Sequence, residues 1–415
     1  MTQSLHIGLV SYEFPPAVAI GGIGTYAWNA ARMLAAAGHH VEVFAAGPAA
    51  SPIQSEPASA HGVRVHRIAA PDRACFRKAV VKPFAKRHQE TPFDVLESPE
   101  IGAEAVELIQ RFPQLPLVVK LHTSTQLLAH LGGERPFWRK RLRYAAGALR
   151  RGRWAWLSPP HKGPDQVLER QFTLKAHAIA APSEAIARAV QRDWGVSVGG
   201  CDVFPLPYAP DPALLELPVP RRLDTIGFIG RLETRKGIYE LAGAMLPLLP
   251  RHPDLQLRLI GPSWPTERGD SRSWLEGFLA PVLHQVVFTG PVSPDAIAEH
   301  LAHCSAVVLP SRWESFGLVC AESMAAARLV IGSAAGGMAD MIEPGVSGFL
   351  VPPRSPGAIR RVLQRLLERP ECIASVAATA RRRILELLDP AQVLPLQLAS
   401  YSRAIERARA GATPC

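Results

Sequence analysis

The sequence predicts an α/β protein of two doubly wound domains, each built on a parallel sheet. Short runs rich in β-branched residues alternate with longer stretches of helical periodicity along the chain, and this alternation is typical of βαβ units. A proline-rich segment, 204–220, divides the runs into two groups. Proline at that density favours an extended connector, so we expect one domain on each side of it.

The expected strands of the first group lie at 6–11, 41–45, 63–68, 94–97, 117–122, 178–181 and 202–204. Those of the second group lie at 225–230, 256–261, 286–290, 306–310, 330–332 and 348–351. We assign residues 1–208 to the first domain and 209–390 to the second, with 209–220 as linker, and expect a helix in 391–415 that crosses back to the first domain. Ligands of such sheets bind beyond the carboxyl ends of the strands, so two facing domains predict one deep cleft.

Composition excludes several classes of protein. No run approaches the 18 apolar residues that a membrane span needs, and the first ten residues enter a strand pattern without a signal peptide. The six cysteines show no paired spacing, which fits a reducing cytosol better than a disulfide framework or a zinc site. We therefore expect a cytoplasmic protein without a metal site.

The net charge of +10 is unevenly distributed between the two domains. Residues 1–208 carry 24 Lys/Arg against 16 Asp/Glu, whereas residues 209–415 carry 22 against 20. An anionic surface partner is therefore expected to meet the first domain.

The first candidate motif is a glycine turn that contains Gly22 and Gly24, between the first strand and a helical pattern. Glycines let backbone N–H groups approach a phosphate, and a helix N-terminus adds partial positive charge. The same residues also suit a flexible surface turn. The turn differs from a dinucleotide fingerprint because the loop that precedes it is too long.

The second candidate is the turn Gly230-Arg231-Leu232-Glu233-Thr234-Arg235-Lys236-Gly237, directly after the first strand of the second domain. Arg231 can fork phosphate oxygens and Lys236 can meet them as a point charge, so the turn suits a diphosphate. A solvated basic turn is the alternative, but the position after a sheet strand favours binding.

The third candidate is a pair of glutamates, Glu314 and Glu322, spaced eight residues apart. We expect Glu314 in the loop after the strand at 306–310, and Glu322 more than a turn into the next helix. Glu322 has apolar neighbours, and a buried carboxylate needs hydrogen bonds such as sugar or ribose hydroxyls offer. A structural ion pair for each glutamate is the alternative.

Taken in order, the glycine turn, the G-R-x-x-x-x-K-G turn and the E-x7-E pair resemble family-four glycosyltransferases of the GT-B fold, also called group 1. Further matches are "GHHVEVF", the His122 that closes "VVKLHTS", and "AAGGMADMIEPGVSGFLVPP". The resemblance spans nearly the whole chain. It implies transfer of a hexose from a nucleotide diphosphate sugar, with retention of configuration and without a bound metal.

The resemblance also implies a role for each matching residue. Arg231 and Lys236 would clamp the diphosphate and stabilise the leaving group, Glu314 would bind the donor sugar, and Glu322 the ribose. His122 would lie near the reacting sugar; ending a buried strand is its alternative. Other donor contacts are implied for Gly22, Gly230, Gly261, Pro262, Phe316, Gly317 and Leu318, with Gly336 and Gly337 closing on the diphosphate. In front-side attack, the leaving phosphate itself accepts the acceptor's proton.

Three features depart from the family pattern. Where a histidine-rich strand end is common, this chain has Glu97 and Glu100, which could bind acceptor hydroxyls or face solvent. Asp340 stands in place of the usual glutamate, which we expect to matter little, and Thr123 follows the cleft histidine.

A basic segment at 131–156 also predicts contact with an anionic membrane surface. It combines eight Lys/Arg and one acid with an apolar stripe at helical spacing, and basic amphipathic helices lie in membrane interfaces. An ordinary surface helix is the alternative. The segment includes Arg135, Arg139, Lys140, Arg141, Arg143, Arg150, Arg151 and Arg153, and a second basic run includes Arg73, Arg77, Lys78, Lys82, Lys86 and Arg87.

We thus predict a cytoplasmic glycosyltransferase, peripheral on the inner membrane face, that acts on a lipid-linked or polysaccharide-precursor acceptor. The alternatives are transfer to a soluble metabolite or sugar phosphate, and a non-catalytic nucleotide-sugar binder. The donor base, whether UDP, GDP or ADP, stays open. Nucleic acid is not an expected partner, because the sequence contains no recognition module.

Overall fold

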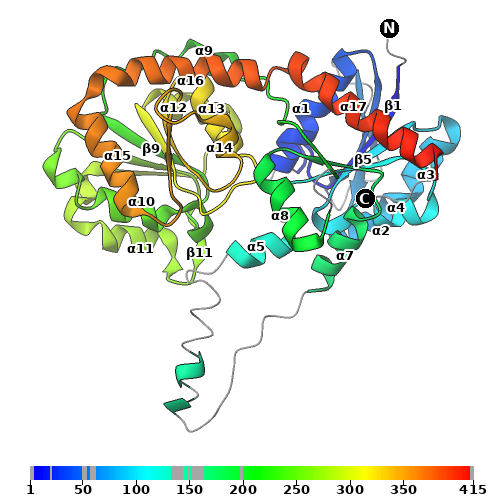
Figure 1. The fold of residues 1–415 in the computed structure, drawn as a ribbon, viewed down its shortest axis with the longest axis horizontal. Coiled ribbons are helices and arrows are strands. Elements are labelled where there is room, and N and C mark those ends of the chain that lie inside the picture. The colour runs from blue at the N-terminus through cyan, green and yellow to red at the C-terminus, as the bar shows by residue number, and fades with distance from the viewer. Residues whose placement is uncertain are drawn as a thin grey trace.

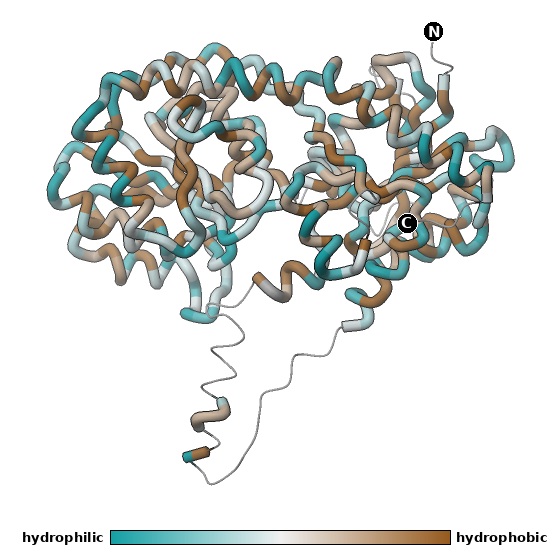
Figure 2. Tube along the Cα trace, viewed as in Figure 1, coloured by the Kyte–Doolittle hydropathy of each residue, from teal (hydrophilic) through white to brown (hydrophobic). Residues whose placement is uncertain are grey.

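A computed structural model of the chain describes residues 4–18, 21–48, 54–56, 62–131, 144–147, 149–150, 163–196 and 200–411. Two α/β lobes lie side by side, with the longest helices running across the top of both (Figure 1). Hydrophobic residues gather along the strands inside each lobe, while the outer helices alternate between polar and apolar faces (Figure 2). Each lobe therefore has its own sheet and its own core.

The first domain holds an eight-stranded sheet in the order β3-β4-β2-β1-β5-β6-β7-β8. Its strands are β1 (His6–Ser11), β2 (His40–Gly47), β3 (Gln54–Glu56), β4 (Val63–Ala69), β5 (Val95–Pro99), β6 (Leu117–Lys120), β7 (Ala178–Ala181) and β8 (Cys201–Val203). All pair in parallel except β3, an antiparallel edge strand that the sequence did not predict. The strand order reverses direction at β1, which lies between β2 and β5, and such a switch point is where ligands bind.

Helices cover both faces of this sheet. They are α1 (Gly22–Ala36), α2 (Arg73–Ala79), α3 (Val81–Glu90), α4 (Val106–Arg111), α5 (Thr125–Leu131), α7 (Pro164–Thr173) and α8 (Glu184–Trp194). Helix α8 shows how the sequence sets a boundary: the Ser183 side chain accepts the Ile186 N–H at its start, and Gly195 ends it in the left-handed conformation.

The second domain holds six parallel strands in the order β13-β10-β9-β14-β15-β16, so the two predicted doubly wound domains are confirmed. The strands are β9 (Thr225–Ile229), β10 (Gln256–Ile260), β13 (Val286–Gly290), β14 (Ala306–Leu309), β15 (Leu329–Ser333) and β16 (Phe349–Val351). The helices are α10 (Ile238–Met245), α11 (Ser271–Phe278), α12 (Ile297–Ala302), α13 (Leu318–Ala325), α14 (Met338–Met341) and α15 (Pro356–Glu368), and a small hairpin joins β11 (Pro265–Thr266) to β12 (Gly269–Asp270). The order turns at β9, between β10 and β14, which is a second switch point.

The connector between the domains is not extended throughout, so that expectation was wrong. It contains the short helix α9 (Pro212–Glu216). Proline is well tolerated at the first helical position, and the Asp211 carboxylate caps the Ala213 N–H.

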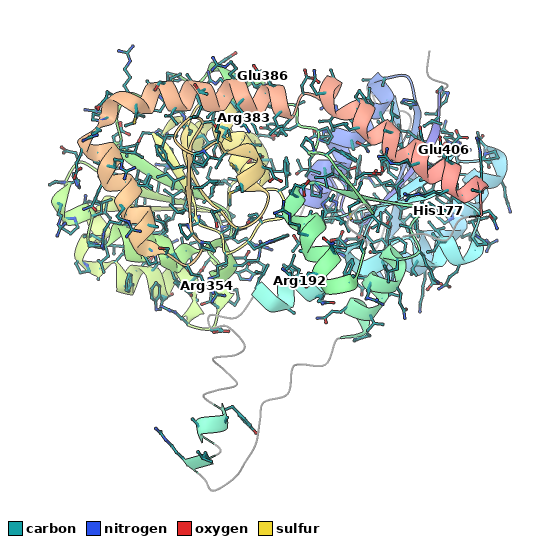
Figure 3. All side chains as sticks on the ribbon, viewed as in Figure 1. His177, Arg192, Arg354, Arg383, Glu386 and Glu406 are labelled. Atoms are coloured by element: carbon teal, nitrogen blue, oxygen red, sulfur yellow. The ribbon has the colours of Figure 1, made fainter. Side chains whose placement is uncertain are left out.

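Two helices at the end of the chain join the domains. Helix α16 (Ile373–Leu387) packs on the second domain, and α17 (Pro390–Arg409) lies against β5, β6 and β7 of the first. Arg383 and Glu386 lie over the second domain and Glu406 over the first (Figure 3). Near its end, α17 is tied down by Arg407, which donates to the His177 carbonyl at 2.9 Å.

The centre of α17 is tied to the first sheet through a buried carboxylate, Glu97. Tyr401 donates to it at 2.9 Å, Gln397 at 3.2 Å and Tyr26 of α1 at 2.7 Å. Lys120, also buried, lies over the rings of Tyr26 and Phe204. Because these donors come from α17 and α1, the carboxylate joins the returning helix to the first domain.

The basic segment 131–156 falls mostly outside the described residues. Of the second basic run, Arg73 pairs with Glu13 and Glu104, and Arg87 pairs with Glu42 and Glu90. These arginines are therefore engaged by the protein's own carboxylates rather than free for an anionic surface. A search of the described helices finds none that is both long and apolar enough to cross a bilayer.

We expect Tyr401→Phe to lower the thermal transition by about 1 to 2 °C, because it removes a donor from buried Glu97 at a net cost of about 1 kcal/mol in a chain of 415 residues. Differential scanning calorimetry measures this. The matched control is Tyr144→Phe, since Tyr144 is 43% exposed. Equal transitions for the two variants would contradict a stabilising role for the bond.

Candidate active site

A cleft of about 430 Å³ lies between the two domains, at the carboxyl ends of β1 and β9. The first domain contributes Gly21, Gly22, Ile23, Ile101, His122, Thr123 and Leu128. The second contributes Phe228, Ile229, Gly230, Arg231, Arg235, Lys236, Leu309, Ser311, Met338 and the stretch from Glu314 to Cys320. Both switch points therefore open into one space.

The glycine turn lies at the first domain's side of this cleft, where α1 begins. A Cβ on Gly22 would stand 3.5 Å from the Leu318 side chain of the other domain, and one on Gly24 would press on Glu13 at 3.5 Å. The turn therefore lies within van der Waals distance of Leu318 in the second domain.

Three cations gather in the turn after β9. The Arg231 guanidinium stacks over the Trp264 ring at 4.6 Å and stands 3.3 Å from Glu233. Arg235 pairs with the same Glu233 at 2.8 Å. Lys236 meets Glu314 at 2.5 Å. With three cations against two carboxylates, this wall of the cleft keeps a net positive charge, which suits an anionic ligand.

The sharp shape of this turn depends on glycine. Gly237 has a φ of 75°, and a Cβ there would stand only 2.1 Å from the Pro310 carbonyl oxygen. Gly261 has a φ of 136°, and a Cβ there would stand only 2.2 Å from the Gly230 carbonyl oxygen. These contacts bring the turn against the carboxyl ends of β10 and β14.

Glu314 is the carboxylate at the centre of this wall. Its Oε1 accepts from Lys236 Nζ, from the Ser311 hydroxyl at 3.0 Å and from Arg235 at 3.5 Å. Burial raises the pKa of Glu314, but Lys236 and Arg235 outweigh burial and hold the pKa below its usual value. Glu314 is therefore ionised at neutral pH, and among the described residues all its hydrogen-bond donors meet Oε1.

The backbone after Glu314 forms the start of α13. Gly317 has a φ of 102° and precedes the helix. The first N–H groups of a helix have no intrahelical acceptor, which applies to those of Gly317 and Leu318, and Phe316 directly before the helix lines the same cleft. The backbone of Gly336 and Gly337 packs closely against this loop. A Cβ on Gly336 would stand 2.0 Å from the Glu314 carbonyl oxygen, and a Cβ on Gly337 would stand 2.5 Å from the Ser315 carbonyl oxygen.

Glu322 lies in α13, one turn further from the cleft. It is not among the residues that line the cleft, although it is one of the described residues. Burial raises the pKa of Glu322 to about 7, and the carboxyl lies near the Tyr208 hydroxyl. The structure thus brings Arg231, Lys236 and Glu314 into one cleft and places Glu322 behind it.

His122 follows β6 by two residues and lines the cleft although it is only 7% exposed. Burial, Lys120 and Arg73 lower the pKa of His122 to about 3. The imidazole is therefore neutral at physiological pH, and its ring stands edge-on to Tyr26 at 5.4 Å. His122 can therefore donate a hydrogen bond to a ligand or accept one from it, but it carries no charge.

Glu97 and Glu100 do not face solvent, since they are 4% and 0% exposed, so that alternative was wrong. Glu97 is engaged by Tyr26, Gln397 and Tyr401. Glu100 accepts the His122 N–H at 2.8 Å, and burial raises its pKa to about 8. Their contacts hold α17 and the His122 loop, and among the described residues neither carboxylate is part of the cleft lining.

Gly261 and Pro262 lie beside the cleft rather than in its lining among the described residues. The Pro262 carbonyl accepts the Leu232 N–H at 3.0 Å, so this segment supports the basic turn. No cluster of metal-ligating side chains occurs in the described ranges.

Several residues of the site were not anticipated from the sequence. Arg235 and Ser311 both contact Glu314, and Glu233 bridges Arg231 and Arg235. The signal for Arg235 was present, because it is a third cation in the same turn. The Glu314 loop is also held against α10 by a buried ion pair, in which Arg312 lies 2.9 Å from Glu240.

Comparisons with known proteins agree with this architecture. Residues 21–207 match the family model described as "Glycosyl transferase 4-like domain", and residues 224–369 match "Glycosyl transferases group 1". Together the two models cover most of the chain, one for each domain.

Named relatives are similar along most of their length. The glycogen synthase of Mycobacterium tuberculosis H37Rv is 26% identical over 93% of this chain and 91% of the relative. The D-inositol 3-phosphate glycosyltransferase of Frankia alni is 28% identical over 87% of this chain and 89% of the relative.

Solved structures share the fold at low identity. Sucrose-phosphate synthase from Thermosynechococcus elongatus has a TM-score of 0.73 at 23% identity, over 97% of this chain and 100% of the other. Anabaena HepE with UDP-glucose has 0.67 at 17%, over 96% and 100%. The catalytic domain of Arabidopsis thaliana starch synthase IV, bound to ADP and acarbose, has 0.69 at 14%, over 98% and 100%. The fold is therefore GT-B, and with both family models matched, the chain belongs to the group 1 glycosyltransferases.

Proposed function

We propose that this glycosyltransferase moves a hexose from a nucleotide diphosphate sugar to a glycan acceptor, with retention of configuration and without a metal ion. One observation carries the proposal: Arg231, Arg235, Lys236 and the ionised Glu314 converge on a cleft that His122 lines from the other domain. Cations fixed in a partly buried site suit a leaving diphosphate.

Each residue has a role in this proposal. Arg231 and Lys236 bind the diphosphate oxygens, and the N–H groups of Phe316, Gly317 and Leu318 add donors at the helix N-terminus. Glu314 accepts from sugar hydroxyls while Lys236 and Arg235 hold it in place. The cations stabilise the charge that a divalent metal neutralises in other transferases.

The reaction follows a front-side course. The bond from the sugar's anomeric carbon to the phosphate oxygen breaks, and the bond to the acceptor oxygen forms on the same face. The acceptor's proton passes to the leaving phosphate oxygen, so no protein base is needed. Neutral His122 orients hydroxyls near the reacting carbon.

The acceptor is a polysaccharide or its precursor, or a sugar phosphate. The glycogen synthase and D-inositol 3-phosphate glycosyltransferase relatives support these classes. The proposal also includes a lipid-linked precursor at the inner membrane face, because the basic composition of the segment 131–156 favours contact with an anionic surface. The donor's nucleotide is UDP or ADP, which HepE and starch synthase IV bind.

We expect UDP or ADP to raise the melting temperature, and Arg231→Ala to weaken binding of that nucleotide about tenfold, since a charge-assisted phosphate contact is lost. Isothermal titration calorimetry measures the affinity. Arg272→Ala is the matched control, because Arg272 is an exposed arginine of α11 paired with Glu276. If a panel of UDP, ADP and GDP leaves the melting temperature unchanged, the proposed donor site is wrong.

We expect hydrolysis or transfer of the donor sugar to yield first the anomer that the donor carries, and at the same rate in EDTA. Proton NMR of the early product identifies the anomer before mutarotation. An inverted product would contradict front-side attack, and loss of the rate in EDTA would contradict the role given to the three cations.

We expect nucleotide affinity to rise with pH through Glu322, about tenfold between pH 6 and pH 8. Its pKa of about 7 leaves the carboxyl mostly protonated at pH 6, and ribose hydroxyls that donate to the carboxylate favour the ionised form. Calorimetry across this range measures the trend. Glu322→Gln removes this titrating carboxyl group alone. If nucleotide affinity depends on pH in this variant as it does in the unmodified protein, ribose binding by Glu322 is refuted.

A further inference from the structure

Two hydrogen bonds cross directly from the first domain to the donor side of the second. The Ser183 hydroxyl donates to the Ser315 carbonyl at 2.5 Å, and the Glu184 N–H donates to the Asp340 carboxylate at 3.0 Å. Both donors stand at the start of α8, which lies on the side of the first domain that faces the second (Figure 1). These bonds exist only while the two domains are close.

The Ser183 side chain is fixed by burial and by its role as a helix cap. It is 1% exposed, and its oxygen also accepts the Ile186 N–H as the cap of α8. One hydroxyl therefore caps the start of a helix in its own domain and donates to the other domain.

The Ser315 carbonyl accepts one hydrogen bond and lies close to the Gly337 backbone. Ser183 meets it from the first domain, and a Cβ on Gly337 would stand 2.5 Å from the same oxygen. A trans peptide is planar, so its N–H points opposite to its carbonyl. Fixing the Ser315 carbonyl thus fixes the direction of the Phe316 N–H, one of the donors proposed for the diphosphate.

We propose that Ser183 and Asp340 are positioning residues that couple domain closure to the donor loop. When α8 reaches the second domain, Ser183 orients the Ser315–Phe316 peptide and Asp340 holds the helix start in place. The inference rests on the proposed function for its consequence, nucleotide binding, but the coupling itself is a property of the ligand-free protein. Asp340, expected from the sequence to matter little, has a role in this proposal through its bond to Glu184.

The first test uses hydrogen exchange of the ligand-free protein, read by mass spectrometry. We expect Ser183→Ala and Asp340→Ala each to speed exchange about fivefold to tenfold in the peptide that covers 315–320, because each variant loses one of the two hydrogen bonds between the start of α8 and the second domain. Asp340→Asn keeps an acceptor oxygen and should exchange like the unmodified protein.

The loss of a helix cap needs its own control, since Ser183→Ala also removes one. Asp72→Ala removes the cap that α2 receives at the Cys75 N–H, away from the second domain. We expect this variant to leave exchange in 315–320 unchanged. Equal exchange of this peptide in Ser183→Ala and in the unmodified protein overturns the proposal, and so does equal exchange in Asp340→Ala and Asp340→Asn.

The second test measures affinity for UDP and ADP. Ser183→Ala should weaken whichever of them binds by about fivefold, through the misaligned Phe316 N–H, with little change in the Arg272→Ala control. If neither nucleotide binds the unmodified protein, the proposed function fails while the exchange result still decides the coupling. If nucleotide binds all variants equally, the positioning role fails and the proposed function stands.

Discussion

The cleft depends on one buried electrostatic arrangement, the carboxylate of Glu314 facing Lys236 and Arg235. Burial by itself raises the pKa of this carboxyl, but these cations hold the pKa below its usual value. In return, Glu314 fixes two long, flexible side chains that would otherwise lose conformational entropy when a ligand orders them. The wall is thereby organised for a diphosphate before the ligand arrives.

This arrangement explains why backbone contacts around it are so close. Glu314 reaches Lys236 only because the turn after β9 presses on the end of β14, where Gly237 meets the Pro310 carbonyl. The Glu314 loop is supported from behind in the same way by Gly336 and Gly337. Larger residues at these positions would separate the strands' ends and pull the charges apart. The glycines therefore matter less for contact with a ligand than for bringing the two loops together.

How well the sequence predicts each part of this structure depends on how far apart in the sequence the interacting residues lie. Strands such as β1 and β13 follow from local periodicity and occur where expected. The edge strand β3, the helix α9 and the hairpin of β11 and β12 are short, so they carry too little periodicity to predict. Among site residues, Arg231, Lys236 and Glu314 are recognisable because their spacing is local. That Glu97 is buried rather than solvent-facing could not be predicted, because its partners Gln397 and Tyr401 lie about 300 residues away in sequence.

The protein's own hydrogen-bond donors explain what Glu97 and Glu100, the acidic residues near His122, do in this structure. A carboxylate at a strand's carboxyl end is available to a ligand only if the protein supplies no donors of its own. Glu97 receives three, and Glu100 receives the N–H of His122, the residue it might otherwise assist. Their contribution is to hold the helix and the loop that form the first domain's wall. Glu97 and Glu100 thus serve the structure of the first domain, while Glu314 and its cations form the charged wall of the cleft.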